Sequence, residues 1–155
     1  QGDAQVIIDI LSRYYFETEL FKEATKPVPA SALKAWMLDA QKKAYGEGLD
    51  PNLRHPFMWL MKPHYYSAGL NFYNFPYAFG LLFGKGLYGL YEKDPVPFTD
   101  QYETLLAYTT KASVEDVAKT MQIDVTQPNF WHQSLEVISK DIHDVIYLLE
   151  KTKDA

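Results

Sequence analysis

The apolar residues at the start of the chain recur three or four positions apart, which predicts a helix over residues 3–25 with one apolar stripe. The stripe consists of Ile7, Ile10, Leu11, Tyr14, Thr18 and Phe21. Charged residues, among them Arg13 and Glu17, decorate the other faces of this helix. Pro27 and Pro29 follow, and they predict its end.

The next stretch predicts a second helix over residues 30–45. It would bury Leu33, Trp36, Met37 and Ala40. Gly46 follows directly, and a glycine at this position predicts a left-handed C-cap that ends the helix. Residues 47–63 contain glycines and prolines without helical periodicity, which predicts a long ordered connection, and loops of this length in compact domains tend to be functional.

A third helix is expected to begin between Asn71 and Asn74 and to reach Glu92. Pro76 belongs in its first turn, because a proline deeper in a helix would leave a carbonyl without its partner, so Asn74 is the favoured cap. Four glycines within this helix predict that another segment packs closely against it; they are Gly80, Gly84, Gly86 and Gly89.

The last third of the chain predicts a break at residues 94–97 and three further helices. The first covers residues 98–109 and buries Tyr102, Leu105 and Leu106; the second is short and is capped by Ser113. The third begins between residues 126 and 129 and carries a long amphipathic seam. The seam consists of Trp131, Leu135, Ile138, Ile142, Val145 and Leu149. The pattern predicts an all-α fold of about five to six helices, forming a single helical region over residues 1–155.

Composition and charge exclude several classes of function. The net charge is −5, and only Arg13 and Arg54 among the 15 basic residues are arginine, which argues against a nucleic-acid partner. The chain has no cysteine, which excludes disulfides and thiolate zinc sites and favours a cytoplasmic protein. Residues 63–84 are long enough to cross a membrane, but Pro63, Pro76 and several polar residues argue against a span.

Aromatic, hydroxyl and amide side chains concentrate between residues 56 and 91, around His64. Between Lys62 and Lys85 no side chain carries a formal charge at neutral pH, unless His64 is protonated. Aromatic rings mixed with uncharged polar groups are typical of a cleft wall. His64 and the phenols of Tyr73 and Tyr77 would supply several donors to a developing oxyanion. An aromatic core, with the tyrosine hydroxyls bonded to backbone, is the alternative interpretation.

Other chemistry is not supported by the residues alone. His55, His132 and His143 form no His-Glu-x-x-His arrangement, and no serine stands in a Gly-x-Ser-x-Gly turn. The residues alone therefore predict no metal-ligand set and no catalytic nucleophile in this chain.

The chain resembles the C-terminal part of the oligoendopeptidase F family, relatives of thimet oligopeptidase among the zinc peptidases. The resemblance is carried by residues 13–21 (RYYFETELF), 41–46 (QKKAYG), 55–59 (HPFMW), 62–66 (KPHYY) and, most specifically, 71–80 (NFYNFPYAFG). Shorter matches follow at residues 82–83, 86–88, 113–116, 123–124 and 130–131. The likeness covers nearly the whole chain.

The resemblance implies the helical C-terminal portion of a zincin-type catalytic domain that cuts oligopeptides in a deep channel. His64 matches a histidine that steadies the substrate carbonyl, and Tyr73 matches a functional tyrosine. Tyr77 lies one residue beyond a second such tyrosine, whose place is taken by Pro76. The aromatic loop over residues 56–70 would form a substrate wall, with Trp59, Tyr65, Tyr66 and Gly69 as the expected substrate-binding residues.

The departures from the family pattern concern the metal. The zinc ligands and the general-base glutamate are absent, so zinc is expected in a parent enzyme and not in this chain, which would be inactive alone. The expected partners are an oligopeptide substrate and the N-terminal remainder of the peptidase. Two alternatives stay open. One is a non-catalytic helical module that binds peptides or a partner, and the other is a fragment whose broken apolar face favours self-association.

Overall fold

The computed structural model describes residues 2–23 and 25–153, and within them it contains helices, turns and loops but no strand. The predicted all-α fold is confirmed. The chain forms two compact units, which divide between Phe79 and Gly80. Helix α4 (Phe75–Lys93) begins in the first unit and has most of its residues in the second.

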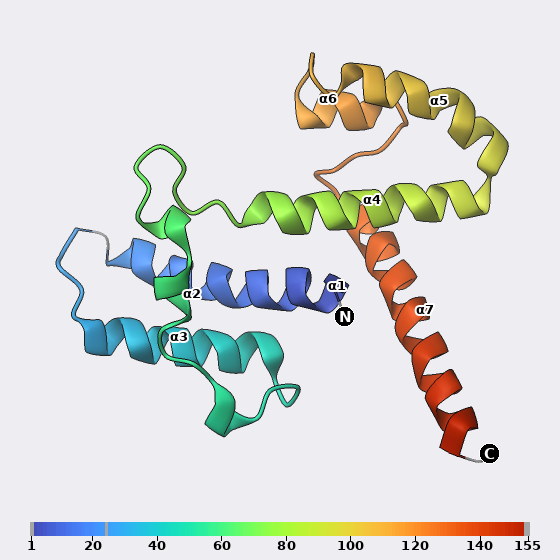
Figure 1. Cartoon of the computed structure of the whole chain (residues 1–155). Helices are drawn as coiled ribbons and strands as arrows, with labels where there is room; N and C mark the ends of the chain where they lie inside the picture. The colour runs from blue at the N-terminus through green and yellow to red at the C-terminus, as the bar shows by residue number, and fades with distance from the viewer. Residues whose placement is uncertain (1, 24, 154–155) are drawn as a thin grey trace. The chain divides into compact units, whose positions relative to one another are not determined.

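The first unit is built on two helical segments that lie side by side (Figure 1). One is a continuous run of α1 (Gly2–Ala4), the π-helical turn η1 (Gln5–Asp9) and α2 (Ile10–Lys22). The other is α3 (Ala30–Tyr45), whose bounds are those predicted. Their shared core consists of Phe16, Met37 and Ala40, with partly buried Tyr15, Leu20, Leu33, Trp36, Met58, Trp59 and Tyr65 packed around it.

The apolar stripe of the first helix does not form this core. Phe16, which lies outside the stripe, is only 2% exposed, whereas Tyr14 and Phe21 are each 60% exposed. The helix carries apolar residues on two faces, and periodicity alone cannot tell which of them a neighbour covers. The stripe instead lines an open groove, which is described below.

The connection after α3 is ordered, as predicted, and contains three short 3₁₀ turns: η2 (Pro51–Leu53), η3 (Met58–Met61) and η4 (Pro63–Tyr65). Gly46 has a φ of 54° and donates its N–H to the carbonyl of Lys42, which confirms its role at the end of α3. The buried amide of Gln41 holds the connection by bonding both the carbonyl and the N–H of His55, at 2.8 and 3.0 Å.

The second unit contains the rest of α4 together with α5 (Pro95–Tyr108), α6 (Val114–Lys119) and α7 (Pro128–Lys153). Its core consists of Leu87, Leu105, Val117, Ala118, Met121, Ile123 and Phe130. Pro76 lies in the first turn of α4, and the hydroxyl of Ser113 accepts the N–H of Asp116 at 3.2 Å. Both of these helix starts are as predicted.

The predicted start of α5 is wrong. Residues 94–97 were expected to break the chain, but Pro95 and Pro97 lie inside the first turn of the helix. A proline is tolerated there because the first N–H groups of a helix have no partner within it. Leu105 is buried as expected, whereas Tyr102 and Leu106 are exposed.

The amphipathic seam of α7 is buried only near the start of the helix. Trp131 and Ile138 are half-buried, while Ile142, Val145 and Leu149 are each more than half exposed. Exposed apolar side chains on one helix favour association with another chain. The expected self-association stays a prediction.

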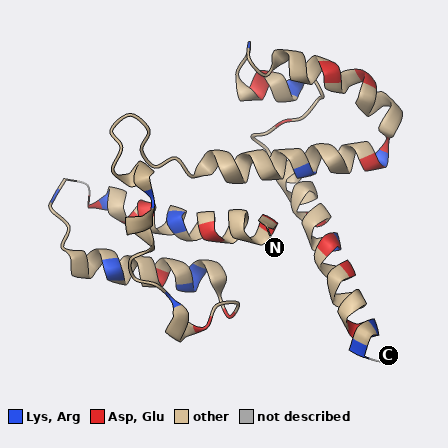
Figure 2. Ribbon diagram, in the orientation of Figure 1, with Lys and Arg blue, Asp and Glu red and all other residues tan. Residues whose placement is uncertain are grey.

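Charged residues are sparse on α4, where the first is Lys85, and frequent along α7 (Figure 2). Even so, within residues 2–23 and 25–153 no helix combines the length and the apolarity that a membrane crossing requires.

The glycines of α4 differ in their surroundings, and this difference predicts opposite effects of alanine. A Cβ atom on Gly86 would lie 2.4 Å from the ring of Phe130 and 2.6 Å from Oγ of Ser134, whereas Gly84 has open space around it. We expect Gly86→Ala to lower the free energy of unfolding by about 1–3 kcal/mol through overpacking. The matched change Gly84→Ala should raise it by up to about 1 kcal/mol, because alanine favours the helix. Urea unfolding of both variants checks the pair; equal effects would contradict the packing.

Candidate functional site

A hollow of about 410 Å³ in the first unit contains the histidine singled out by the sequence. Its walls come from three segments: the first helical run, residues 62–64, and the first turn of α4. The lining residues are Gln5, Val6, Asp9, Ile10, Arg13, Lys62, His64 and Tyr77. The hollow therefore brings an imidazole, a phenol and two cations together.

Local backbone geometry places His64 beside the start of α4. The carbonyl of His64 accepts the N–H of Phe72 at 3.3 Å, which closes the loop between them. Phe72 adopts a φ of 52°, a left-handed conformation that is uncommon for a bulky residue. Its ring packs on Phe21 and Tyr65, with centroids 4.7 and 5.4 Å apart, and this packing holds the turn. The turn folds the loop back, so that His64 and Tyr77 line one hollow.

The imidazole of His64 is neutral at physiological pH. Partial burial lowers its pKa below the ordinary value of 6.5, and the positive charges of Arg13 and Lys62 lower it further. Its Nδ1 is buried and has no hydrogen-bond partner among the described residues. A neutral imidazole offers one N–H donor, so this side chain can donate to a carbonyl oxygen.

A buried polar network joins the start of α4 to the first helix. Asn74 is only 3% exposed; its Oδ1 accepts from Nη1 of Arg13 at 3.0 Å, and its Nδ2 donates to the carboxylate of Glu17. Arg13 also pairs through Nη2 with Asp9, one turn earlier. α4 begins directly after Asn74, as predicted, but the amide of Asn74 bonds to α2 instead of capping α4.

This network corrects the expectation that Arg13 and Glu17 only decorate the helix surface. The Arg13 side chain is 13% exposed, and burial raises the pKa of Glu17 above 4.5, although the neighbouring Tyr65 hydroxyl, the hydrogen bond from Asn74 and the charge of Arg13 oppose this shift. Asp9, Arg13 and Glu17 lie four residues apart on one helix face, the signal that sequence reasoning did not use. Their partner Asn74 is distant in sequence, so the contact itself was not predictable from spacing.

The other residues expected at the site lie in different surroundings. Tyr73 does not line the hollow, but its ring packs edge-on against Tyr77 with the centroids 5.8 Å apart. Trp59 and Tyr65 pack against the core of the first unit. Tyr66 is 61% exposed, and Gly69 is exposed as well. His64 and Tyr77 therefore line the hollow itself, whereas Tyr73 contacts it only through its packing against Tyr77.

The buried phenol of Tyr65 predicts an alkaline loss of stability. Burial, and then the neighbouring Glu17 carboxylate, raise the pKa of Tyr65 far above 10.0. Above pH 10 the unfolded chain therefore loses this proton while the folded chain keeps it, so the free energy of unfolding falls by up to about 1.4 kcal/mol per pH unit. Urea unfolding between pH 9 and 11 measures the fall. Tyr65→Phe should remove this contribution, and the exposed control Tyr66→Phe should retain it; equal slopes in the two variants would contradict the burial.

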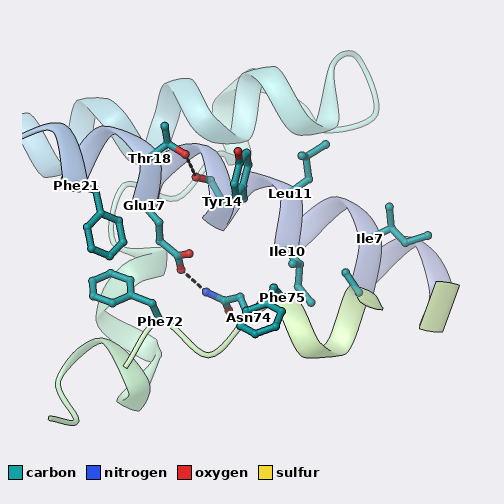
Figure 3. Close-up of a pocket in the computed structure, with 11 residues that line it drawn as sticks. Ile7, Ile10, Leu11, Tyr14, Glu17, Thr18, Phe21, Phe72, Asn74 and Phe75 are labelled. Carbon is teal, nitrogen blue, oxygen red and sulfur yellow. Dashed lines mark hydrogen bonds between the residues drawn. The ribbon is translucent and has the colours of Figure 1, made fainter. Parts of the chain in front are cut away.

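A second cavity, an apolar groove of about 530 Å³, lies along the stripe of the first helix (Figure 3). It is lined by all six stripe residues together with Glu17, Phe72, Asn74, Phe75 and Ala78. Figure 3 shows Phe21 facing Phe72 and the amide of Asn74 directed at Glu17. Its walls suit apolar side chains and offer no catalytic group other than Glu17, which is bonded to Asn74.

Within residues 2–23 and 25–153, no group of three or more His, Asp or Glu side chains is placed to hold a metal ion.

Comparison with known proteins relates the chain to a peptidase. It is 25% identical over 130 residues to Oligopeptidase PepF of Bacillus subtilis (strain 168). The match covers 84% of this chain but 19% of the relative, so the chain spans about a fifth of the length of the curated relative it matches. No protein-family model matches the chain, and no solved structure matches it significantly. The match indicates a distant relation to peptidases.

Proposed function

We propose that this chain is the C-terminal helical part of a zinc-dependent oligoendopeptidase and supplies donors that stabilise the transition state of peptide-bond hydrolysis. The observation that carries the proposal is the hollow shared by His64 and Tyr77, in a chain related to an oligopeptidase. Zinc, its ligands and the general base would belong to the remainder of the enzyme. Zinc, when bound there, would activate the attacking water.

The part of this chain in the reaction is electrostatic. As water attacks, the carbonyl oxygen of the scissile peptide becomes an oxyanion, and donors fixed at that position lower the barrier. The neutral imidazole of His64 and the hydroxyl of Tyr77 would donate to this oxygen. Tyr73, whose ring packs on Tyr77, would hold that phenol in place or donate as a third group.

The experiment is hydrolysis of a fluorogenic oligopeptide by the enzyme that contains this chain, with His64 or Tyr77 replaced. The proposal expects turnover to fall strongly while substrate binding changes little. Unchanged turnover in both variants would contradict it.

Peptide binding without catalysis is a second candidate function, and the apolar groove beside α2 favours it. A binding module would retain peptides in this groove whether or not His64 is present. The gene sequence distinguishes these two candidate functions. A His-Glu-x-x-His motif encoded shortly upstream, in the same reading frame, favours the enzyme.

A further inference from the structure

The hydrogen-bonding groups of the hollow are unbalanced, because donors exceed acceptors. Arg13 uses Nη1 and Nη2 for Asn74 and Asp9, but its Nε is buried and has no hydrogen-bond partner, and Oδ1 of Asp9 is a buried acceptor that also has none. Within the described part of the chain, no acidic side chain pairs with Lys62, and the hydroxyl of Tyr77 makes no hydrogen bond. A ligand that satisfies the donors, Arg13, Lys62 and Tyr77, must accept hydrogen bonds.

The charges of the hollow favour an anion. Asp9 is committed to Arg13, and His64 is neutral, so Lys62 provides the uncompensated charge. An ionised carboxylate is acceptor-only, has two oxygens for two or more donors, and forms its strongest hydrogen bonds with cations. A protonated amine, by contrast, would meet two cations and few acceptors.

We propose that this hollow binds the free carboxylate at the end of a peptide, with Lys62 as the principal charge partner and Arg13 and Tyr77 as further donors. The inference rests on the proposed function and deepens it, because hydrolysis of a peptide bond creates such a carboxylate beside His64. Peptides with free carboxyl ends would thus occupy the site as products and compete with substrate.

The test is binding of N-acetyl-trialanine to the chain, followed through the NMR signals of residues 62–64 and 77. The free acid should shift these signals and bind at least about tenfold more tightly than its C-terminal amide, since a charged hydrogen bond is lost in the amide. Binding of the acid should weaken with added salt and disappear as its carboxylate is protonated near pH 3.5. Acetate alone should bind more weakly than the tripeptide.

Variants assign the preference to Lys62. Lys62→Ala should remove the difference between acid and amide, and Lys62→Arg should keep it. The control Lys43→Ala changes a surface lysine that pairs with Asp39, and it should leave the preference intact. Replacement of Arg13 is less informative, because Arg13 also holds the fold.

Three outcomes would overturn the inference. They are equal affinities of acid and amide, acetate binding as tightly as the peptide, and a preference that survives Lys62→Ala. A separate measurement distinguishes failure of this inference from failure of the proposed function. It is hydrolysis, by the parent enzyme, of oligopeptides whose C-terminus is an amide. Such hydrolysis, if it depends on His64, leaves the oxyanion role in place.

Discussion

Replacement of His64 by alanine is expected to lower the turnover of the oligoendopeptidase that we propose contains this chain by a hundredfold or more. The loss of one oxyanion donor typically costs about 2.7–4 kcal/mol of transition-state stabilisation. The imidazole and Tyr77 line the same hollow, and the lowered pKa of His64 keeps it in the neutral form. Because the interaction strengthens only as the oxyanion forms, kcat should fall and KM should change little.

The controls for this prediction lie in the same chain. His132→Ala removes an exposed histidine of α7 and should leave turnover unchanged. Tyr77→Phe keeps the ring that packs on Tyr73 but removes the hydroxyl, so it should also lower kcat. Steady-state kinetics on a fluorogenic oligopeptide measure all three. Full turnover in both His64→Ala and Tyr77→Phe would exclude the oxyanion role.

Replacement of Arg13 by methionine is expected to lower the free energy of unfolding by about 3–5 kcal/mol. The guanidinium pairs with Asp9 and donates to Asn74, and the side chains of Arg13 and Asp9 are 13% and 11% exposed. Removing one partner of a buried pair leaves the other charge without compensation. Urea unfolding of the variant measures the loss.

Two further variants show whether the buried charge is the cause. Asp9→Leu combined with Arg13→Met removes both charges and should recover much of the stability. Lys43→Ala breaks an exposed pair with Asp39 at 2.6 Å and should cost no more than about 1 kcal/mol. A loss of similar size for Arg13→Met and Lys43→Ala would contradict the buried network.

Local rules predicted much of the fold. Both ends of the helix predicted over residues 30–45 were correct, because the proline before it and Gly46 after it mark its limits within a few residues. The positions of Pro76 and Ser113 were correct for the same reason. The start of α5 was missed because a proline pair is compatible with both a break and a first helical turn.

Burial was harder to predict than helix position. The stripe on the first helix and the seam on α7 are real periodic features, but each is exposed over much of its length. Periodicity gives the faces of a helix, and only the tertiary partners decide which face is covered. Among the α4 glycines, Gly86 packs closely against Phe130, as expected of the set, while Gly84 does not.

The candidate site was predictable in part. The family resemblance pointed to His64 and Tyr73, and less directly to Tyr77. His64 and Tyr77 line one hollow, whereas Tyr73 only packs against Tyr77. Asp9, Arg13 and Lys62 were missed as site residues, since charged residues at helical spacing are usually solvated. Their role depends on Asn74 and on the return of the loop, which no local pattern encodes.

The most direct test is the structure of the enzyme that contains this chain bound to a phosphinic peptide, whose tetrahedral phosphorus mimics the attacked carbonyl. We expect one phosphinyl oxygen to lie within about 2.6–3.2 Å of both the His64 imidazole and the Tyr77 hydroxyl. The role proposed for this hollow would be contradicted if the phosphinyl group bound elsewhere and His64 and Tyr77 contacted only solvent or the flanking residues of the peptide.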